Sequence, residues 1–466
     1  MVRIFSILGL LCSIFCFSNR MMFNSPFFLI PFVYTICTAI YIRRKRDFSF
    51  SPGLIALHIA MFMRYVVVIF SYYLNNSMSL YTVDYNYTTQ ATYLMVYEMI
   101  AIFIATDYLS NKSRNKKVQV QFSDNTIFNT SPIGIIIVGV ILVLLAGSFL
   151  HLDQGYRVFL SGAYADLRDI EAETGQGTHY IDIIWETLCV WWFVYFICSQ
   201  QQLYKPKKNN IFIVLSVIIS LIFIVITFIG QTSINRWYTI MTALSLIALL
   251  TKLYPNKRKG IAMTIFIPLG LIIMLATLIK NAGYEAGATT VGESLKTLFN
   301  PSEMDSYFAG PVGVGNAITV AKLPQSGLSM IFGDVFRSIP LIGRLFDSFP
   351  SSLSEYWRLQ GRGDLINPLI GQSVAYFGYI LSPILSIFCV YLIFVFDRKY
   401  KQKNSYLTYI YAFCGIWFAI VPMMLNLTIG VNWFFIRIIP FSIALYITNK
   451  WSMRKRLQTK MVYQND

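Results

Sequence analysis

The sequence has little charge for its length. Only 13% of its 466 residues are charged, whereas 56% are hydrophobic. Soluble globular chains carry about 25% charged residues, so this composition excludes an ordinary soluble protein. Apolar runs of about 20 residues, the length that crosses a bilayer as a helix, recur along the chain. Alternating ten-residue strand patterns do not recur, which argues against an outer-membrane barrel.

Histidine is scarce, and cysteine occurs only in apolar runs. The three histidines are His58, His151 and His179, and His58 is predicted to be a packed core residue. This distribution gives no metal-ligand spacing and no disulfide framework, and no phosphate-cradling Gly-Lys-Ser/Thr loop occurs. We therefore expect no metal and no cofactor. The seven cysteines are Cys12, Cys16, Cys37, Cys189, Cys198, Cys389 and Cys414.

Acidic residues are also few, which leaves a net charge of +16. Of the 38 Lys and Arg, 25 are Arg3 and the residues of short segments that follow every second apolar run. This is the positive-inside pattern, which predicts that these turns and both termini are cytoplasmic. A nucleic-acid surface would need the charges on one face, so we expect no nucleic-acid partner. The basic turns lie at 43–46, 112–117, 205–208, 252–259, 398–403 and 450–460.

We predict an all-α polytopic membrane protein with about 12 transmembrane helices. Residues 1–280 carry nine of them, with an outward loop at 152–179. Residues 281–370 form one large extracytoplasmic loop, and residues 371–466 carry three spans and a basic cytoplasmic tail. The first run lacks a signal-peptide cleavage site, so we predict that it is retained as a helix. The spans are expected near 2–18, 25–42, 53–74, 89–109, 132–151, 180–200, 211–230, 236–253, 261–280, 371–396, 405–424 and 433–450.

The middle of the large loop, Gly327 to Phe349, mixes apolar residues with charged ones. Pro340 interrupts it, which predicts two short amphipathic helices lying in the membrane interface. Arg337 and Arg344 would share one face if the helix were continuous.

Further along the loop, Arg358 and Arg362 are four apart and would share a face on any helix. The tenth span then begins with small and polar residues, which are typical of a helix end lining a cavity.

Seven arginines lie in three later regions that we predict to face outward: 152–179, the start of the span at 236, and 281–370. Arginine suits phosphate because its planar fork donates two parallel charge-assisted hydrogen bonds and stays protonated. Such donors would neutralise the charge that grows on a diphosphate leaving group. The simpler alternative is that they hold lipid headgroups or pair with local acids such as Asp169, Asp334 and Asp347. The seven predicted diphosphate-binding residues are Arg157, Arg168, Arg236, Arg337, Arg344, Arg358 and Arg362.

The sequence does not identify a general base. His179 borders the outward loop at 152–179, where a neutral imidazole could take a proton from a sugar hydroxyl. An interfacial histidine without a catalytic role is the alternative. The catalytic candidates are His179, Asp166 and Asp364.

The layout resembles the O-antigen and capsule repeat-unit polymerases, the Wzy-type oligosaccharide polymerases. The similarity covers the order of the spans, the cytoplasmic ends and the large late outward loop. Locally it covers Gly361 to Leu385, where Gly-Arg-Gly-Asp precedes Pro-Leu-Ile-Gly-Gln-Ser-Val-Ala-Tyr-Phe-Gly-Tyr. Ser-Ile-Asn-Arg236, at the start of a span, also resembles an arginine that recurs in the family.

The resemblance implies glycosyl transfer between two oligosaccharides linked to undecaprenyl diphosphate, at the outer face of the bacterial cytoplasmic membrane. The growing chain is the donor, the terminal hydroxyl of an incoming repeat unit is the acceptor, and undecaprenyl diphosphate leaves. No nucleotide sugar and no metal are required. Implied partners are membrane lipids and a chain-length regulator and flippase of the same pathway. Arg236 and the large-loop arginines would bind the diphosphate.

Two alternative functions stay open. An O-antigen ligase shares the layout, but ligases pair their large-loop arginines with a histidine, and the loop at 281–370 contains none. A flippase or exporter of lipid-linked oligosaccharide would distribute charges among the spans and have short loops. Here charge within the spans is sparse, and about ninety residues form one loop.

Overall fold

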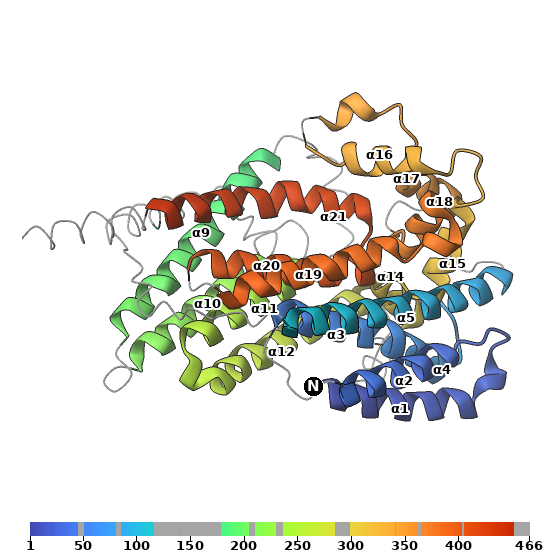
Figure 1. Ribbon diagram of the computed structural model, residues 1–466, viewed down its shortest axis with the longest axis horizontal. Helices are drawn as coiled ribbons and strands as arrows, with labels where there is room; N and C mark the ends of the chain where they lie inside the picture. Colours follow the sequence, from blue (N-terminus) through green and yellow to red (C-terminus); the bar gives the residue numbers. More distant parts are fainter. Residues whose placement is uncertain are drawn as a thin grey trace, which may run out of the picture. The chain divides into compact units, whose positions relative to one another are not determined.

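The structure, a computed structural model, is helical throughout the part of the chain that it describes (Figure 1). Among these residues, five helices are long and apolar enough to cross a membrane, and two bent helix pairs would raise the number to seven. The chain is therefore a multi-pass helical membrane protein, and the total of twelve spans stays a prediction. The structure describes residues 1–44, 51–80, 85–115, 139, 179–204, 210–229, 236–284, 299–340, 342–361, 365–402 and 405–451.

The chain divides into two compact units, each assembled from segments that are distant in the sequence. Unit 1 comprises residues 1–119, 299–398 and 414–435. Unit 2 comprises residues 120–298, 399–413 and 436–466. The predicted loop at 281–370 thus contributes most of its length to unit 1.

The first part of unit 1 is a set of apolar helices whose ends follow local sequence signals. Proline stands at the first position of α3, where its missing N–H costs nothing. Asn76 ends α4 in the left-handed conformation, with φ 47°. The elements are α1 (Val2–Ser18), η1 (Arg20–Met22), α2 (Leu29–Arg44), α3 (Pro52–Phe62), the π-helix η2 (Met63–Val67), α4 (Val68–Asn75) and α5 (Tyr85–Asn115).

The later part of unit 1 begins with short helices that lie within the predicted loop. We call residues 299–361 the short-helix segment. The elements are α14 (Pro301–Phe308), α15 (Pro311–Val320), α16 (Leu328–Phe336), η4 (Gly343–Phe346), α17 (Ser352–Gln360), α18 (Leu369–Leu381), α19 (Ile384–Gln402), α20 (Leu407–Met424), α21 (Leu427–Trp433) and the π-helix η5 (Phe434–Ile438). Three of these helices are divided between the units: residues 399–402 of α19, 407–413 of α20 and 436–438 of η5 belong to unit 2.

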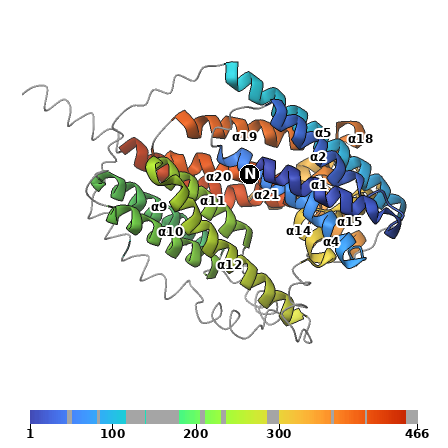
Figure 2. The same cartoon turned by 90° about the horizontal axis from the view of Figure 1, so that it is seen from below.

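Unit 2 is built around four long helices that pack in chain order, each against the next (Figure 2). They are α9 (His179–Leu203), α10 (Ile211–Ile229), α11 (Arg236–Leu253) and α12 (Arg258–Tyr284), with η3 (Pro255–Lys257) between the last two. The chain turns by 117° between α11 and α12.

One end of unit 1 is rich in basic residues. Arg44 at the end of α2 donates to Asp107 near the end of α5, at 2.8 Å. The start of α3 meets the end of α19, because the Gly53 N–H donates to Asp397 at 3.0 Å. The Tyr41 ring, on α2, lies 5.0 Å from the His58 ring, on α3, so the ends of α2 and α5 lie beside the ends of α3 and α19. We call this the basic end, since it also carries Arg43, Lys112 and Arg398.

The short-helix segment begins at the opposite end of unit 1. The Asn75 side chain, at the end of α4, donates to the Phe299 carbonyl at 2.8 Å. Lys322, just after α15, donates to Tyr87 at the start of α5, also at 2.8 Å. Tyr87 and Asp107 are 20 residues apart on α5, which separates the two ends by about 30 Å, at 1.5 Å per residue. Figure 1 shows α15, α16, α17 and α18 gathered where α5 begins.

The predicted tenth span, 371–396, is not one continuous helix. Gly378 has φ 77° and ψ 178°, which is outside the helical region and accessible mainly to glycine. Pro383 then lacks the N–H that a continuing helix would need. As a result α18 and α19 meet at 104°. The small and polar residues at the start of α18, Leu369 to Tyr376, are buried within the protein.

Candidate functional site

The glycine-rich part of the predicted loop is a buried helix. In α15 every residue except Thr319 is buried. Its small residues allow close packing, since a Cβ on Gly371 would lie 2.1 Å from the Ala317 Cβ, and one on Gly315 would lie 3.3 Å from the Tyr87 carbonyl oxygen. Residues 311–320 of the predicted extracytoplasmic loop are therefore a buried helix, and the position of the loop outside the membrane stays a prediction. The run Gly310–Gly315 serves helix packing.

Asp305, on α14, holds the start of α15. Its carboxylate accepts hydrogen bonds from the N–H groups of Val312 and Gly313, at 3.1 and 2.7 Å, and from the Tyr72 hydroxyl. The first N–H groups of a helix have no partner inside it, so a carboxylate there satisfies them and faces the positive end of the helix dipole. Burial raises the pKa of Asp305 to about 6, although these donors and Arg64 oppose the rise.

Asp334, on α16, likewise accepts hydrogen bonds from the first N–H groups of α17. It is fully buried and accepts from the Ser352 N–H at 3.0 Å and from the Ser351 hydroxyl at 2.6 Å. The hydroxyls of Tyr376, on α18, and Thr428, on α21, also donate to it, the latter at 3.2 Å. A single carboxylate therefore joins α16, α17, α18 and α21.

A second layer of hydrogen bonds surrounds this carboxylate. The Gln372 amide donates to the Ser352 hydroxyl at 2.8 Å and accepts from the Leu427 N–H at 2.7 Å. Asn367 donates to the Ser352 carbonyl at 3.2 Å. Gln372, Ser352 and Asn367 are fully buried. Buried hydrogen bonds of this kind hold the surrounding helices in one arrangement.

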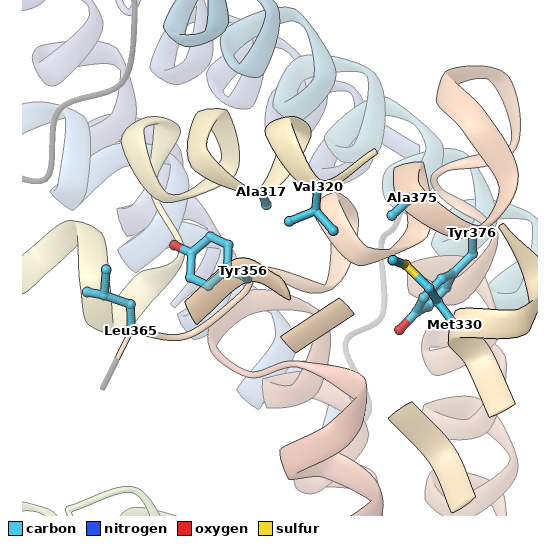
Figure 3. Close-up of a cluster of buried hydrophobic side chains, with 7 residues drawn as sticks. All are labelled: Ala317, Val320, Met330, Tyr356, Leu365, Ala375 and Tyr376. Carbon is cyan, nitrogen blue, oxygen red and sulfur yellow. The ribbon is translucent and has the colours of Figure 1, made fainter. Parts of the chain in front are cut away.

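The short helices also share an apolar core (Figure 3). Ala317 and Val320 come from α15, Met330 from α16, Tyr356 from α17 and Tyr376 from α18. All five are less than 5% exposed. The segment is thus folded around its own apolar core and its two buried aspartates.

These contacts assign a positioning role to Asp305 and Asp334. A general base needs a free lone pair that faces substrate, whereas both carboxylates are buried and take several donors from the protein. The suggestion that Asp334 pairs with an outward arginine is not what the structure shows, because its partners are hydroxyls and backbone N–H groups. Sequence reasoning missed both roles, since each aspartate caps a helix other than its own.

Three of the predicted arginines have described side chains, and all three lie at the surface of the short-helix segment. The Arg337 Nε lies 3.4 Å from Asp347, and the Arg358 Nε lies 2.7 Å from Glu355. The side chains of Arg337 and Arg358 are 34% and 62% exposed. Arg344 is exposed on η4. Local acids thus pair with two of the three, as the simpler alternative predicted.

The shared helix face considered for Arg337 and Arg344 required a continuous helix, and the structure has none there. Helix α16 ends at Phe336, before Arg337, and η4 is a separate turn, so Arg337 and Arg344 share no helix. Two short helices on either side of Pro340 are nevertheless present, as predicted. Helix α17 ends at Gln360, where Gly361 takes the left-handed conformation, and Arg362 lies outside the described residues.

The other predicted site residues stay predictions. Arg236 begins α11 and His179 begins α9, but the structure describes only their backbone. The remaining residues lie outside the described part of the chain; they are Arg157, Arg168, Arg362, Asp166 and Asp364. The structure therefore does not bring the seven arginines together in one described site.

An ion pair that the sequence did not reveal lies inside unit 1. Arg64, on the π-helix η2, lies 3.1 Å from Glu98 on α5, and both side chains are fully buried. Arg64 also donates to the carbonyls of Ala309 and Pro422, at 3.0 and 2.6 Å, and the Ser386 hydroxyl donates to Glu98 at 2.6 Å. A buried pair needs such additional hydrogen bonds to offset its desolvation. It joins η2, α5, α19 and α20 to the residue that ends α14.

Unit 2 holds a similar pair in a more open setting. Arg437, on the π-helix η5, lies 3.3 Å from Glu186 on α9, with side chains 12% and 16% exposed. Its guanidinium carbon stands 4.3 Å from the centre of the Tyr238 ring. Sequence analysis noted only that charge within the spans is sparse, and it paired none of these residues. Opposite charges on separate apolar helices are the signal that could have paired them.

Among the described residues, no three His, Cys, Asp or Glu side chains lie close enough together to bind a metal ion. The seven cysteines are free thiols, and all but Cys37 are buried. What the described site offers is a rigid set of short helices with exposed guanidinium groups.

No family model matches the sequence, and no curated protein or solved structure matches it either.

Proposed function

We propose that this protein polymerises oligosaccharide repeat units linked to undecaprenyl diphosphate into surface polysaccharide, either O-antigen or capsule. The reaction takes place at the outer face of the bacterial cytoplasmic membrane. The growing glycan is transferred to a hydroxyl of the next repeat unit, and undecaprenyl diphosphate leaves. Exposed arginines bind the diphosphate.

The observation that carries the proposal is the placement of the short-helix segment. It begins at the end of unit 1 opposite the basic end, about 30 Å away along α5. Basic turns favour the cytoplasm, so a segment at the other end is expected to face outward. Lipid-linked repeat units present their sugars and diphosphates on that side.

The weak ion pairs on the segment favour anion binding. Arg337 and Arg358 are paired with Asp347 and Glu355, but the four side chains are between 21% and 64% exposed. Exposed ion pairs contribute about 0–1 kcal/mol, because water and salt screen them. A diphosphate carries more charge than one carboxylate and accepts two hydrogen bonds from each guanidinium. It can therefore displace the local acids.

The buried aspartates support the same proposal, because they hold in place the helices that position the arginines. Asp334 joins the helix before Arg337 to the helix that carries Arg358. Binding groups held by a rigid scaffold lose little conformational freedom when the substrate arrives. Arg157, Arg168, Arg236, Arg344 and Arg362 belong to the proposed diphosphate site on the strength of the sequence.

A transporter of lipid-linked oligosaccharide is the second candidate, because two observations favour it. Helices α18 and α19 form a broken span with a 104° bend, and broken helices often mark transporter binding sites. Arg64 and Glu98 form a charged pair inside the spans. That pair is fully buried and hydrogen-bonded, however, so a moving substrate would have to disrupt it. We therefore favour the polymerase.

Deletion of the gene and gel analysis of the surface glycan test the proposal. Loss of the polymerase leaves lipid anchors capped with a single repeat unit and removes the ladder of longer chains. Loss of a transporter removes even the single unit, because repeat units never reach the outer face. Loss of a ligase leaves long glycan on its undecaprenyl carrier and removes all glycan from the final acceptor. Either of the last two patterns, or an unchanged ladder, would overturn the proposal.

A further inference from the structure

A groove of about 690 Å³ runs between α2 and α5 at the basic end of unit 1. Its walls are mainly apolar, with Ile40, Ile100, Phe103 and Ile104 among the lining residues. Ile40 and Ile104 are 48% and 65% exposed, so these walls face the surroundings of the protein. The volume lies within the range of ligand sites, about 300–1,000 Å³.

The mouth of the groove carries two cations. The Arg44 guanidinium donates to Asp107 at 2.8 Å, and its side chain is still 63% exposed. Lys112 is exposed, with its ammonium 6.0 Å from the centre of the Tyr108 ring. With Asp107 counted, the mouth has a net charge of +1. Apolar walls beneath a cationic mouth match a lipid that has acyl chains and an anionic headgroup.

Asp107 adds a more specific signal. One oxygen, Oδ2, accepts from Arg44. The other, Oδ1, is buried and has no hydrogen-bond partner among the residues that the structure describes. A buried acceptor without a donor is costly unless a ligand supplies one. A headgroup with a hydroxyl close to its phosphate would supply that donor.

We propose that this groove binds an anionic glycerophospholipid whose headgroup carries hydroxyl groups, as phosphatidylglycerol does. Arg44 and Lys112 contact the phosphate, Asp107 Oδ1 accepts from a headgroup hydroxyl, and an acyl chain lies along Ile100 and Ile104. Basic pockets between transmembrane helices on the cytoplasmic side bind acidic headgroups in this way. The site is at the opposite end of unit 1 from the short-helix segment, so it does not depend on the proposed polymerase activity.

The two cations and the Asp107 acceptor at the mouth predict which lipid headgroup binds the groove most tightly. Phosphatidylcholine has no headgroup donor for Asp107 and no net negative charge for the two cations. Phosphatidylethanolamine has an ammonium that could donate to Asp107, but no net charge. Phosphatidylglycerol satisfies both requirements, so we expect it to be retained most strongly.

Retention of lipids by the purified full-length protein tests the assignment. The protein is reconstituted in nanodiscs of phosphatidylglycerol, phosphatidylethanolamine and phosphatidylcholine in equal parts, then released and examined by native mass spectrometry. We expect one phosphatidylglycerol to stay bound. The double variant Arg44→Gln/Lys112→Gln should lower its affinity about 25-fold, from about fivefold for each cation. Arg258→Gln/Lys259→Gln, which removes two exposed cations outside the groove, should leave it unchanged.

Two further variants test the acyl and hydroxyl contacts. Ile104→Trp keeps the charges but fills the groove from an exposed position, and it should abolish the retained lipid without lowering the unfolding temperature. Asp107→Asn removes the competing negative charge and keeps an acceptor oxygen, so retention of phosphatidylglycerol should rise severalfold.

Three results would overturn the assignment. Equal retention of the three lipids would show that the groove does not select a headgroup. Equal losses in the two double variants would show a general effect of charge. Preferential retention of phosphatidylethanolamine that is lost in Asp107→Asn would identify a zwitterionic lipid as the occupant.

Discussion

The short-helix segment contains two kinds of charged residue in opposite settings. Asp305 and Asp334 are buried, and each accepts hydrogen bonds from two backbone N–H groups and a tyrosine hydroxyl. Arg337 and Arg358 lie at the surface, each with one exposed or half-buried acid beside it. The difference in burial indicates that the two kinds of residue have different roles. The acids hold the segment in one arrangement, and the arginines are available for a ligand.

The largest loss of stability is expected for Asp334→Ala. The substitution leaves buried N–H and hydroxyl donors without an acceptor at the junction of α16, α17, α18 and α21. Removing one partner from a buried network of this kind costs about 3–5 kcal/mol, and we expect a loss of about that size. Thermal unfolding of the purified protein in detergent measures it. Asp334→Asn keeps one acceptor oxygen and should lose less, and equal stability of Asp334→Ala and the unchanged protein would contradict the anchoring role.

The second buried acid predicts a dependence of stability on pH. Burial raises the pKa of Asp305 to about 6, above the ordinary value of 3.8. The folded protein therefore keeps this proton at a pH where the unfolded chain has lost it, and the stabilisation is fully present only below about pH 4. As the pH rises from about 4 to about 6, the free energy of unfolding should fall by about 1.4 kcal/mol per pH unit.

Unfolding temperatures measured at a series of pH values check this, with Asp305→Asn as the comparison. The variant has no titrating group at this position, so its curve should lack the part of the slope that Asp305 contributes. Parallel curves for the two proteins between pH 4 and 6 would show that Asp305 does not titrate there.

Close helix packing beneath the segment predicts a smaller loss for Gly371→Ala. The new Cβ would lie 2.1 Å from the Ala317 Cβ, so α15 and α18 must move apart. Overpacking of this kind costs about 1–3 kcal/mol. Gly260, near the start of α12, has no neighbouring atom within 4 Å, so Gly260→Ala should leave the protein as stable or more so. A similar unfolding temperature for both variants would contradict the packing of α15 on α18.

The smallest effect on stability is expected for Arg358→Ala. Its pair with Glu355 is exposed, and surface substitutions of this kind change the free energy of unfolding by about 0.5 kcal/mol or less. The same thermal-unfolding assay measures this. A loss of several kcal/mol would show that Arg358 belongs to the scaffold and would remove the contrast with Asp334.

Local sequence signals predicted the elements that depend on them. The helices 2–18 and 236–253 have the predicted bounds, and Pro340 separates two short helices as expected. His58 is buried beside aromatic rings, as an apolar run around it suggested. Hydrophobicity and proline act over a few residues, so they can be read from one stretch of sequence.

Long-range contacts account for what the sequence did not predict. The burial of α15 depends on Gly371, more than fifty residues further on, and Asp334 caps a helix that starts eighteen residues later. The partners of Arg64 lie on α5, on α20 and at the end of α14. The exposed arginines were found from the sequence because their residue type alone signals anion binding. Asp347 was named from the sequence as an acid that could pair with them, whereas the pairing of Arg358 with Glu355 became evident only in the fold.

The most direct test of the account is the surface glycan of cells carrying Arg337→Ala/Arg358→Ala, compared with cells carrying Arg20→Ala. Arg20 is an exposed arginine outside the segment, just after α1. At equal protein levels, the double variant should yield only single repeat units, and Arg20→Ala should yield the full ladder of chain lengths. A full ladder from the double variant would contradict the claim that these guanidinium groups bind the leaving diphosphate.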